Sequence, residues 1–366
     1  MSVDQDCTPA NMASKAATAP HINTNHDIAS VQPSIRVTKR HDRSALMFLL
    51  QHLIKPFSSK LISSSTEHPA GSPQLTPHHH ARRRCDVRER KVDDIYLYDI
   101  VPKDSKTGVT KDRRISAEDE KRRKRRVYYY SGGGWQMPAN SEHWYFLAEL
   151  AQQLHPHGFA ITLVSYPLAP NSPAPLSFPA MLKQYRTLMQ TAEHETEDII
   201  LAGDSAGGNI VLALVISALL QDEGENLQRP TAKALMAISP STDLRRSNAD
   251  MHTIASKDPI LQIPFVKSTA EKWCGSWPPT DFRVSPLHAS VEVLKTRGVK
   301  VHGVTGSHDI LSPDAILMRE KFSQAGVEGE WLDWDKQMHV FPLIFRYGLR
   351  EGREGKDWIL DVLRRS

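Results

Sequence analysis

The chain carries the sequence I-I-L-A-G-D-S-A-G-G-N-I-V-L-A-L-V-I-S-A-L-L at residues 199–220. An apolar, β-prone segment leads into a Gly-x-Ser-x-Gly turn, and the apolar stretch after the turn is typical of a buried helix. Gly203 and Gly207 stand where side chains would collide as the turn folds back on itself. Such a turn exposes the serine hydroxyl, so Ser205 is a candidate nucleophile. The backbone N–H of Ala206 then lies at a helix N-terminus, where unpaired donors favour a developing negative charge.

Length and composition allow one large α/β domain with a tail, or two small domains, in 366 residues that are 40% hydrophobic. The formal net charge is +4, from 46 basic and 42 acidic residues, and one run near residue 120 holds most of the excess. Three cysteines at unrelated spacings, Cys7, Cys85 and Cys274, argue against a disulfide framework and favour a reducing compartment. We expect no metal and no cofactor, and interpret the short tract His78–His80 as part of a linker.

Targeting signals are not evident. No basic segment followed by an apolar core opens the chain, and no apolar run reaches the roughly 18–20 residues that span a bilayer. We therefore predict a cytoplasmic protein, with membrane association as the alternative. The oligomeric state, monomer or homodimer, is left open.

The N-terminal part is divided into three predicted segments. Residues 1–42 show no apolar periodicity and are predicted to be a disordered tail. Residues 43–62 form a predicted amphipathic helix capped by Ser44, and residues 63–85 a linker. The helix is interpreted as a lid over the active site, and peripheral membrane contact through residues 44–62 is the alternative. The residues of its apolar face are Leu46, Leu49, Leu50, Leu53, Ile54 and Phe57.

A strongly charged segment covers residues 104–126 and contains E-D-E-K-R-R-K-R-R. A nucleic-acid or nuclear-import patch has this composition, but no aromatic residues interleave with the basic ones to stack on bases. We therefore predict an exposed loop between two strands and no nucleic-acid partner. The preceding segment, residues 95–101, alternates apolar and polar side chains and is predicted to be an edge strand of an antiparallel pair.

From residue 127 onward, short β-prone segments alternate with helical ones, which predicts a mostly parallel sheet with helices on both faces. Residues 242–286 interrupt this alternation and are predicted to be an insertion near the site. The predicted strands are Val127–Tyr130, Ala160–Ser165, Ile199–Ala202, Ala234–Ile238, Val299–Val304 and Glu330–Trp334. The predicted helices are Glu142–Leu154, Phe178–Thr191, Ala206–Leu220, Pro313–Ala325 and Gly352–Leu363.

A run of glycines, S-G-G-G-W at residues 131–135, directly follows the first of these strands. Glycines at a strand end let backbone N–H groups point into a cavity without side chains in the way. We expect Gly133 and Gly134 to donate to an oxyanion, with the N–H of Ala206 as a third donor.

Two further residues complete a candidate triad. Asp309 follows a predicted strand, at the edge where α/β sheets place their sites, and it is suited to orient an imidazole. His339 follows the last strand and completes the chain order Ser–Asp–His. Asp314 is better interpreted as a carboxylate in the first turn of a helix, and His308 points to the opposite side from its neighbour Asp309.

From about residue 125 to the C-terminus, the chain resembles an α/β-hydrolase of the hormone-sensitive lipase type. The resemblance implies nucleophile Ser205, acid Asp309 and base His339, with an oxyanion hole at Gly133, Gly134 and Ala206 and a lid drawn partly from the N-terminal helix. The motifs that carry it are S-G-G-G-W (131–135), Y-P-L-A-P (166–170), G-D-S-A-G-G-N (203–209), D-F-R-V-S-P-L (281–287), G-S-H-D-I-L-S-P-D (306–314) and M-H-V-F (338–341).

Two positions depart from the family pattern. Ser131 stands where the family motif usually has a histidine that buttresses the glycine loop, and Pro167 stands where an arginine is common. The first departure concerns the geometry of the loop rather than the mechanism, and the second removes an ion pair. Trp135 and Asp204, adjacent to the two motifs, are candidate substrate-binding residues.

The resemblance implies a serine hydrolase that cleaves carboxylic esters with short or medium acyl chains, or acetylated small metabolites, through an acyl-enzyme. An amidase or formamidase with the same triad is one alternative, and a membrane-associated lipase or sterol-ester deacetylase is another. A non-enzymatic receptor on the same fold is the third, and the presence of His339 argues against it.

Overall fold

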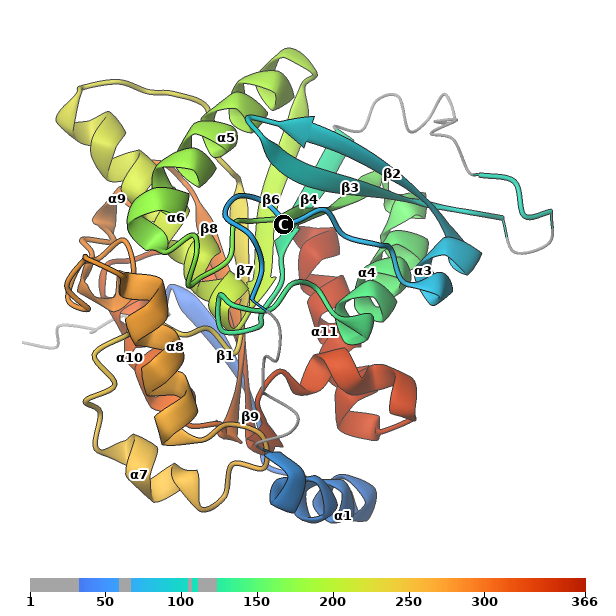
Figure 1. The fold of residues 1–366 in the computed structure, drawn as a ribbon, viewed down its shortest axis with the longest axis vertical. Helices are drawn as coiled ribbons and strands as arrows, with labels where there is room; N and C mark the ends of the chain where they lie inside the picture. The colour runs from blue at the N-terminus through green and yellow to red at the C-terminus, as the bar shows by residue number, and fades with distance from the viewer. Residues whose placement is uncertain (1–32, 59–66, 105–106, 111–123) are drawn as a thin grey trace, which may run out of the picture. The chain divides into compact units, whose positions relative to one another are not determined.

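The computed structural model describes residues 33–58, 67–104, 107–110 and 124–366. They contain a nine-stranded sheet with the order β1-β9-β8-β7-β6-β4-β5-β3-β2 (Figure 1). Strand β3 runs antiparallel to both of its neighbours, and the other strand pairs are parallel. The strands are β1 (Ile35–Arg40), β2 (Cys85–Val92), β3 (Ile95–Pro102), β4 (Lys124–Tyr130), β5 (Phe159–Ser165), β6 (Glu197–Asp204), β7 (Ala234–Ile238), β8 (Lys300–His308) and β9 (Gly329–Met338).

Helices cover both faces of this sheet (Figure 1). Side chains of α5, α6, α9 and α10 belong to the apolar core on one face, and those of α4 and α11 to the core on the other. The α-helices are α1 (Ala45–Ile54), α3 (His79–Arg84), α4 (Ser141–Leu154), α5 (Ala174–His194), α6 (Ala206–Gly224), α7 (Asp250–Ala255), α8 (Ile263–Cys274), α9 (Glu292–Thr296), α10 (Ser312–Gln324) and α11 (Arg350–Arg365). The short 3-10 helices are η1 (Lys55–Phe57), η3 (His155–His157), η4 (Pro286–His288) and η5 (Phe341–Tyr347).

The central strands are buried on both sides. In β4, Val127 and Tyr129 pack into one core while Tyr128 and Tyr130 pack into the other, because successive side chains of a strand point to opposite faces. This double burial explains why the central strands are continuous apolar runs. Helix α6 is the one helix of the described residues that is long and apolar enough to cross a membrane, and 83% of its apolar window is buried in this fold.

The predicted fold class is confirmed, and each of the six strands predicted from residue 127 onward corresponds to an observed strand. The prediction of an edge strand at residues 95–101 was wrong in one respect. The strand exists and is antiparallel, but β2 covers its outer side, so β3 is internal to the sheet. Strand β2 was missed because its side chains are mostly charged and half-exposed, as edge strands often are.

The tail predicted for residues 1–42 includes a strand. Residues 35–40 form β1, which pairs in parallel with β9 at the far edge of the sheet. Of its six side chains only Ile35 is fully buried, so the strand carries almost no apolar pattern and is held mainly by backbone hydrogen bonds. Residues 1–32 of the predicted tail lie outside the described residues.

The two other segments also differ in extent from their predictions. The linker predicted for residues 63–85 ends in helix α3, and β2 begins at Cys85. The charged loop predicted for residues 104–126 gives way to β4 at Lys124, while residues 111–123, with half of the basic run at 121–126, lie outside the described part of the chain.

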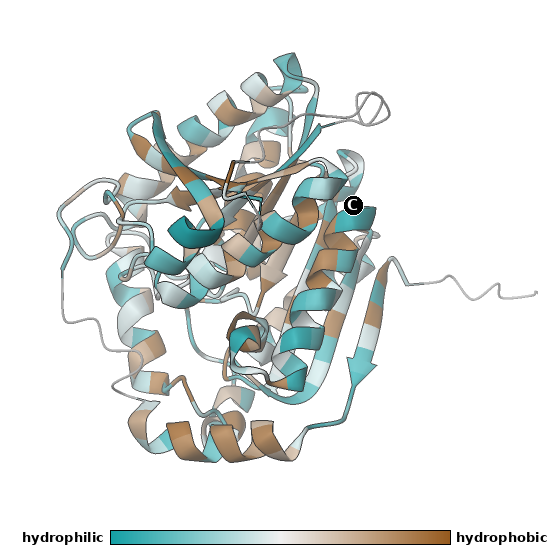
Figure 2. Ribbon diagram, turned by 90° about the vertical axis from the view of Figure 1, so that its right-hand side faces the viewer, coloured by the Kyte–Doolittle hydropathy of each residue, from teal (hydrophilic) through white to brown (hydrophobic). Residues whose placement is uncertain are grey.

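The predicted amphipathic helix is present as α1, followed by η1 at Pro56. The hydroxyl oxygen of Ser44 accepts a hydrogen bond from the N–H of Met47 at 3.1 Å, which confirms the predicted cap. The apolar face is mostly on the outside: Leu46, Leu49 and Leu53 are all more than half exposed. Brown, hydrophobic residues run along this helix at the bottom of Figure 2.

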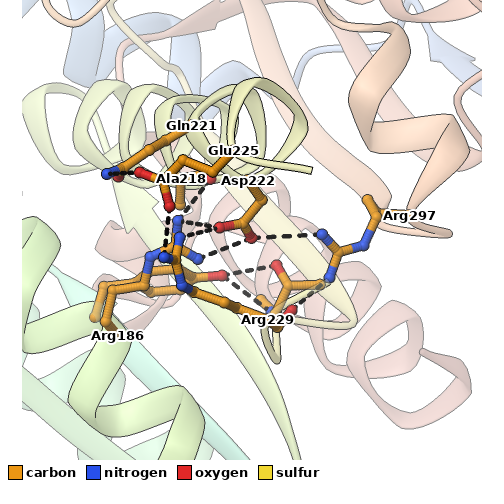
Figure 3. Close-up of polar contacts among 10 residues, drawn as sticks. Arg186, Ala218, Gln221, Asp222, Glu225, Arg229 and Arg297 are labelled. Atoms are coloured by element: carbon orange, nitrogen blue, oxygen red, sulfur yellow. Dashed lines mark hydrogen bonds and ion pairs between the residues drawn. The ribbon is translucent and has the colours of Figure 1, made fainter. Parts of the chain in front are cut away.

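A buried ion cluster joins helices on one face of the sheet (Figure 3). The carboxylate of Asp222, near the end of α6, accepts hydrogen bonds from Arg186 of α5 at 2.6 and 2.9 Å and from Arg229 at 2.8 Å. Arg297, which follows α9, donates to it at 3.4 Å. Asp222 is about 25 Å along the helix from Ser205, because each helical residue adds about 1.5 Å. The cluster therefore stabilises the scaffold rather than the site.

Candidate active site

Ser205 lies at the sharp turn between β6 and α6. Its φ of 52° and ψ of −115° are rare for a residue with a side chain, and its N–H donates to the carbonyl of Ile238 at 2.9 Å. The turn depends on Gly207, where a Cβ atom would collide with the carbonyl of Tyr130. The strained strand-turn-helix predicted from the sequence is therefore present.

Asp309 and His339 are brought together from the ends of β8 and β9. The Nδ1 atom of His339 lies 2.8 Å from Oδ2 of Asp309, and both residues are buried. The second oxygen of Asp309 accepts a hydrogen bond from the N–H of Leu311 at 2.9 Å. This pair fixes the imidazole with its Nε2 atom free to face a substrate.

The electrostatic environment favours a protonated His339. Burial opposes protonation of the imidazole, but the charge of Asp309 and its hydrogen bond outweigh that effect and raise the pKa of His339 above its usual value. Asp258 and Asp204 act in the same direction at longer range. The described hydrogen bonds do not include one from Ser205 Oγ to His339, and in resting enzymes such a bond is often long until substrate binds.

Two of the predicted oxyanion donors, Gly133 and Gly134, border the same cavity as Ser205 and His339, and the third, Ala206, directly follows Ser205. The N–H groups of Gly133, Gly134 and Ala206 donate to no acceptor in the described ranges, whereas that of Gly132 is bonded to Asp204 at 2.9 Å. Gly133 and Gly134 have φ values of 126° and 58°, a conformation that glycine adopts readily. The loop can therefore present two backbone donors opposite the helix N-terminus.

Asp204, predicted as a substrate-binding residue, borders the cavity but is only 2% exposed. Its carboxylate accepts hydrogen bonds from the Tyr129 hydroxyl at 2.7 Å and from Gly132, and His143 Nε2 lies 3.2 Å away. Burial opposes ionisation, but these three partners lower the pKa of Asp204 below its usual value. With its oxygens occupied by protein donors, Asp204 is placed to hold the glycine loop.

Trp135, the other predicted substrate-binding residue, is 1% exposed and borders the cavity. Its ring stacks on Trp273 of α8 with centroids 5.8 Å apart and planes only 9° from parallel. This stacking anchors the end of the glycine loop to the insertion. Contact between Trp135 and a substrate stays a prediction.

Ser131, where the family usually has histidine, is buried, and its carbonyl accepts a hydrogen bond from the Tyr166 hydroxyl at 2.9 Å. Together with Asp204 and His143, this bond holds the loop that the missing histidine would buttress.

Asp314 and His308 are not part of the Asp309–His339 pair, as expected. Asp314 is in the first turn of α10 and accepts a hydrogen bond from Asn248 at 2.7 Å, and His308 is half-buried on β8.

A cavity of about 570 Å³ is lined by the candidate residues Ser205 and His339 and by the glycines of the loop. Its wall is mostly apolar. The apolar residues come from α1, the glycine loop and the residues after it, the insertion of residues 242–286, the turn after β8 and the stretch around the end of β9. Residues of the insertion thus border the cavity, and the role of the insertion at an active site stays a prediction. Apolar residues that border the cavity include Leu50, Ile54, Phe265, Val266, Leu311 and Leu343.

A further carboxylate near the pair, Asp258, was not predicted from the sequence. Its oxygens accept hydrogen bonds from the N–H groups of Ile260, Leu261 and Ile310, at 2.8, 2.8 and 2.9 Å. Burial and the neighbouring Asp309 raise the pKa of Asp258 to about 7, against the effect of these three donors. Asp258 thus ties the insertion to the residue that follows Asp309. No sequence signal marks it, since its partners are backbone groups.

Within the described ranges, no three His, Cys, Asp or Glu side chains are grouped so that they could hold a metal ion.

The chain is similar to several known proteins. A family model described as alpha/beta hydrolase fold matches residues 127–343. An esterase from Acinetobacter venetianus is 33% identical over 166 residues, 45% of this chain and 51% of that protein. An acetyl-hydrolase from Streptomyces hygroscopicus is 27% identical over 184 residues, 50% of this chain and 58% of that protein. The chain thus spans about half the length of these curated relatives.

Among solved structures, a hormone-sensitive lipase from a metagenome library superimposes with a TM-score of 0.65 at 20% identity. The match covers 89% of this chain and 100% of that one. At this identity the likeness concerns the fold. The chain therefore belongs to the alpha/beta hydrolase family, with the fold of its hormone-sensitive lipase type.

Proposed function

We propose that the chain is a carboxylic ester hydrolase that acts through Ser205, His339 and Asp309. The single observation that carries the proposal is the 2.8 Å contact between His339 and Asp309 at the edge of the cavity that also contains Ser205. The relatives named esterase and acetyl-hydrolase support ester cleavage by this chain.

In the proposed reaction, His339 takes the proton of Ser205 as Oγ attacks the ester carbonyl. The N–H groups of Gly133, Gly134 and Ala206 stabilise the oxyanion of the tetrahedral intermediate. The alcohol leaves with the proton from His339, and an acyl-enzyme remains on Ser205. Water, deprotonated by His339, then attacks the acyl-enzyme and releases the carboxylic acid.

The cavity supports substrates with a short or medium acyl chain or an acetylated small metabolite. Its volume of about 570 Å³ accommodates a small ester, and its mostly apolar wall favours hydrocarbon groups. A second candidate, a lipase that works at a lipid surface, is favoured by the exposed apolar side chains of α1.

The proposal is tested by the hydrolysis of p-nitrophenyl esters from acetate to decanoate, with wild type and Ser205→Ala compared. Turnover that disappears in Ser205→Ala, together with labelling of Ser205 by a fluorophosphonate, is the expected result. Activity retained in Ser205→Ala would place the nucleophile elsewhere, and turnover of p-nitroanilides but not of esters would favour the amidase.

A further inference from the structure

Arg246 is a buried arginine in the wall of the active-site cavity. It lies in the insertion between β7 and α7, is only 5% exposed and borders the same cavity as Ser205 and His339. Its φ of 53° is unusual for a residue with a long side chain, and strained positions of this kind cluster at functional sites. The triad and the oxyanion donors make no use of it.

The hydrogen-bond partners of Arg246 are all uncharged. Its Nη2 donates to the hydroxyl of Ser241 at 2.7 Å, its Nη1 to the carbonyl of Asp243 at 2.8 Å and its Nε to the carbonyl of Val266 at 3.4 Å. These bonds use three of the five N–H groups of a guanidinium. In the described part of the chain, no carboxylate lies within 4.0 Å of Arg246.

The neighbouring Arg245, unlike Arg246, has a carboxylate partner. It is 41% exposed and forms an ion pair with the Asp243 carboxylate at 2.7 Å, so it occupies the acid closest in sequence. Arg246 is left with carboxylates at longer range, those of Asp243, Asp314 and Asp309.

The charge of Arg246 is therefore only partly compensated. Burial lowers its pKa to about 10, yet the guanidinium remains positive at neutral pH. A buried cation without a paired anion is unfavourable, and an anion that enters its surroundings gains a strong, charge-assisted interaction. In a cavity with an otherwise mostly apolar wall, Arg246 is a specific point of attraction for a negative group.

The guanidinium is also close to the reacting centre. The N–H of Ser241 donates to the carbonyl of Ser205 at 3.2 Å, and the hydroxyl of the same serine accepts the bond from Arg246. One residue thus separates the cation from the candidate nucleophile.

We propose that Arg246 determines specificity by binding a carboxylate that the substrate ester carries in addition to its scissile bond. The proposal rests on the proposed function and narrows its substrates to two kinds of ester. One is a monoester of a dicarboxylic acid, with the free carboxylate on the acyl side, and the other is a hydroxy acid acylated on its hydroxyl oxygen, with the free carboxylate on the alcohol side. Arg246 takes no part in bond cleavage and positions the ester through its free carboxylate.

The test compares esters matched in shape. On the acyl side, p-nitrophenyl hydrogen adipate is compared with p-nitrophenyl hexanoate, and on the alcohol side 4-acetoxybenzoate with 4-methylphenyl acetate. Each pair is measured with wild type, Arg246→Met and the matched control Arg245→Met, which removes an exposed arginine one position away. The readout is the ratio of kcat/KM for the anionic ester to that for the neutral ester.

We expect Arg246→Met to lower this ratio by about tenfold to a hundredfold for one of the two pairs, the typical loss for a charge-assisted hydrogen bond. The pair affected tells whether the carboxylate belongs to the acyl or the alcohol side. Arg245→Met should leave both ratios within about twofold of wild type, because the Arg245 side chain is 41% exposed and does not border the cavity. Ratios unchanged in Arg246→Met would overturn the proposal and leave Arg246 as a support for the insertion.

A second measurement applies where Arg246→Met does not fold. Adipate should inhibit hydrolysis of the hexanoate ester by wild type competitively, and uncharged 1,6-hexanediol at the same concentration should not. Equal inhibition by adipate and 1,6-hexanediol would contradict the carboxylate site, but serine-dependent hydrolysis would still support the proposed function. If no ester is cleaved, calorimetric titration of wild type and Arg246→Lys with adipate reads out binding alone, and the absence of heat in wild type would refute the carboxylate site.

Discussion

The carboxylate of Asp204 accepts a hydrogen bond from the backbone N–H of Gly132 at 2.9 Å. It connects the end of β6, just before the candidate nucleophile, to the loop that presents the candidate oxyanion donors. The two segments are 72 residues apart in sequence, and this bond fixes the distance between them. The geometry of the proposed oxyanion hole therefore depends on a side chain that does not contact the reacting atoms.

Replacing Asp204 by alanine is expected to lower kcat for p-nitrophenyl butyrate by about tenfold or more, since misplaced oxyanion donors lose much of their effect. The free energy of unfolding, measured with urea, should fall by about 3 kcal/mol, because the buried groups of Tyr129, Gly132 and His143 lose their acceptor. The conservative variant Asp204→Asn keeps one acceptor oxygen and should give intermediate values.

Tyr129→Phe is the control for this experiment. It removes one donor to Asp204 but leaves the bond to Gly132, so kcat should stay near that of wild type. A folded Asp204→Ala with the kcat of wild type would show that the loop keeps its shape without this carboxylate.

The pH dependence of hydrolysis should report on His339. The base acts in its neutral form, so kcat/KM should rise with pH through a pKa above about 6.5, the ordinary value for histidine. Asp309→Asn removes the charge that raises this pKa. The midpoint of the rise should then move to lower pH, and the maximal rate should fall by about 10⁴-fold, because the imidazole loses its tautomer and orientation.

The matched control is Asp357→Asn, which changes a carboxylate on the exposed side of α11. Its profile should superimpose on that of wild type. A midpoint in Asp309→Asn that stays in place or moves upward would mean that another group controls the titration.

The parts of the molecule that could be predicted from the sequence are those with strong local patterns. The parallel strands from β4 onward are buried on both faces, so they stand out as apolar runs, and the turn at Ser205 has a glycine signature enforced by close contacts. Strands β1 and β2 lie at the edges of the sheet, where backbone pairing replaces apolar burial, and they were missed for that reason.

In the candidate site, the residues that belong to sequence motifs were predicted, and the residues that stand out only through their tertiary contacts were not. Besides partners nearby in the chain, Asp258 and Arg246 each bond one backbone group that is distant in sequence, and nothing in their neighbours indicates that bond. Asp204 was singled out because it adjoins the serine, but its orientation toward Gly132 and His143 depends on the packing of α4 against β4 and β6. Side-chain direction of this kind follows only from the assembled fold.

The stability of the scaffold should depend on the Asp222 cluster (Figure 3). Asp222→Ala leaves Arg186 without its buried partner, and the free energy of unfolding is expected to fall by about 3–5 kcal/mol, the usual effect of breaking a buried pair. Because the cluster is at the far end of α6, kcat for a short ester should be unchanged where the protein is folded.

Glu225→Ala is the matched control, since it removes an exposed carboxylate that also pairs with Arg229. Its effect on urea unfolding should be a small fraction of that of Asp222→Ala. If the two variants lowered the free energy of unfolding equally, the burial of Asp222 would add nothing to the stability that its ion pairs provide.

The inner side of α1 is predicted to limit the acyl chain. Leu50 borders the cavity, so Leu50→Trp should reduce its volume and move the optimum in the p-nitrophenyl series to shorter chains. Leu49→Trp places the same bulk on the outer side, where the side chain is 52% exposed, and should leave the optimum unchanged. Identical profiles for the two variants would exclude α1 as part of the acyl site.

The outer side of the same helix is predicted to bind a lipid surface. Leu46, Leu49, Leu53 and Phe57 are each more than half exposed, and an apolar helix face of this kind binds at the boundary between head groups and acyl chains. The double variant Leu49→Ser/Leu53→Ser should therefore weaken binding to phosphatidylcholine vesicles, measured by co-sedimentation, by about tenfold or more, since one fully buried leucine contributes about 1.5–3 kcal/mol and tenfold corresponds to about 1.4 kcal/mol. Hydrolysis of soluble p-nitrophenyl acetate should be unchanged, because neither side chain borders the cavity. Equal sedimentation of wild type and the double variant would leave α1 with a role only on its inner side, as a wall of the active site.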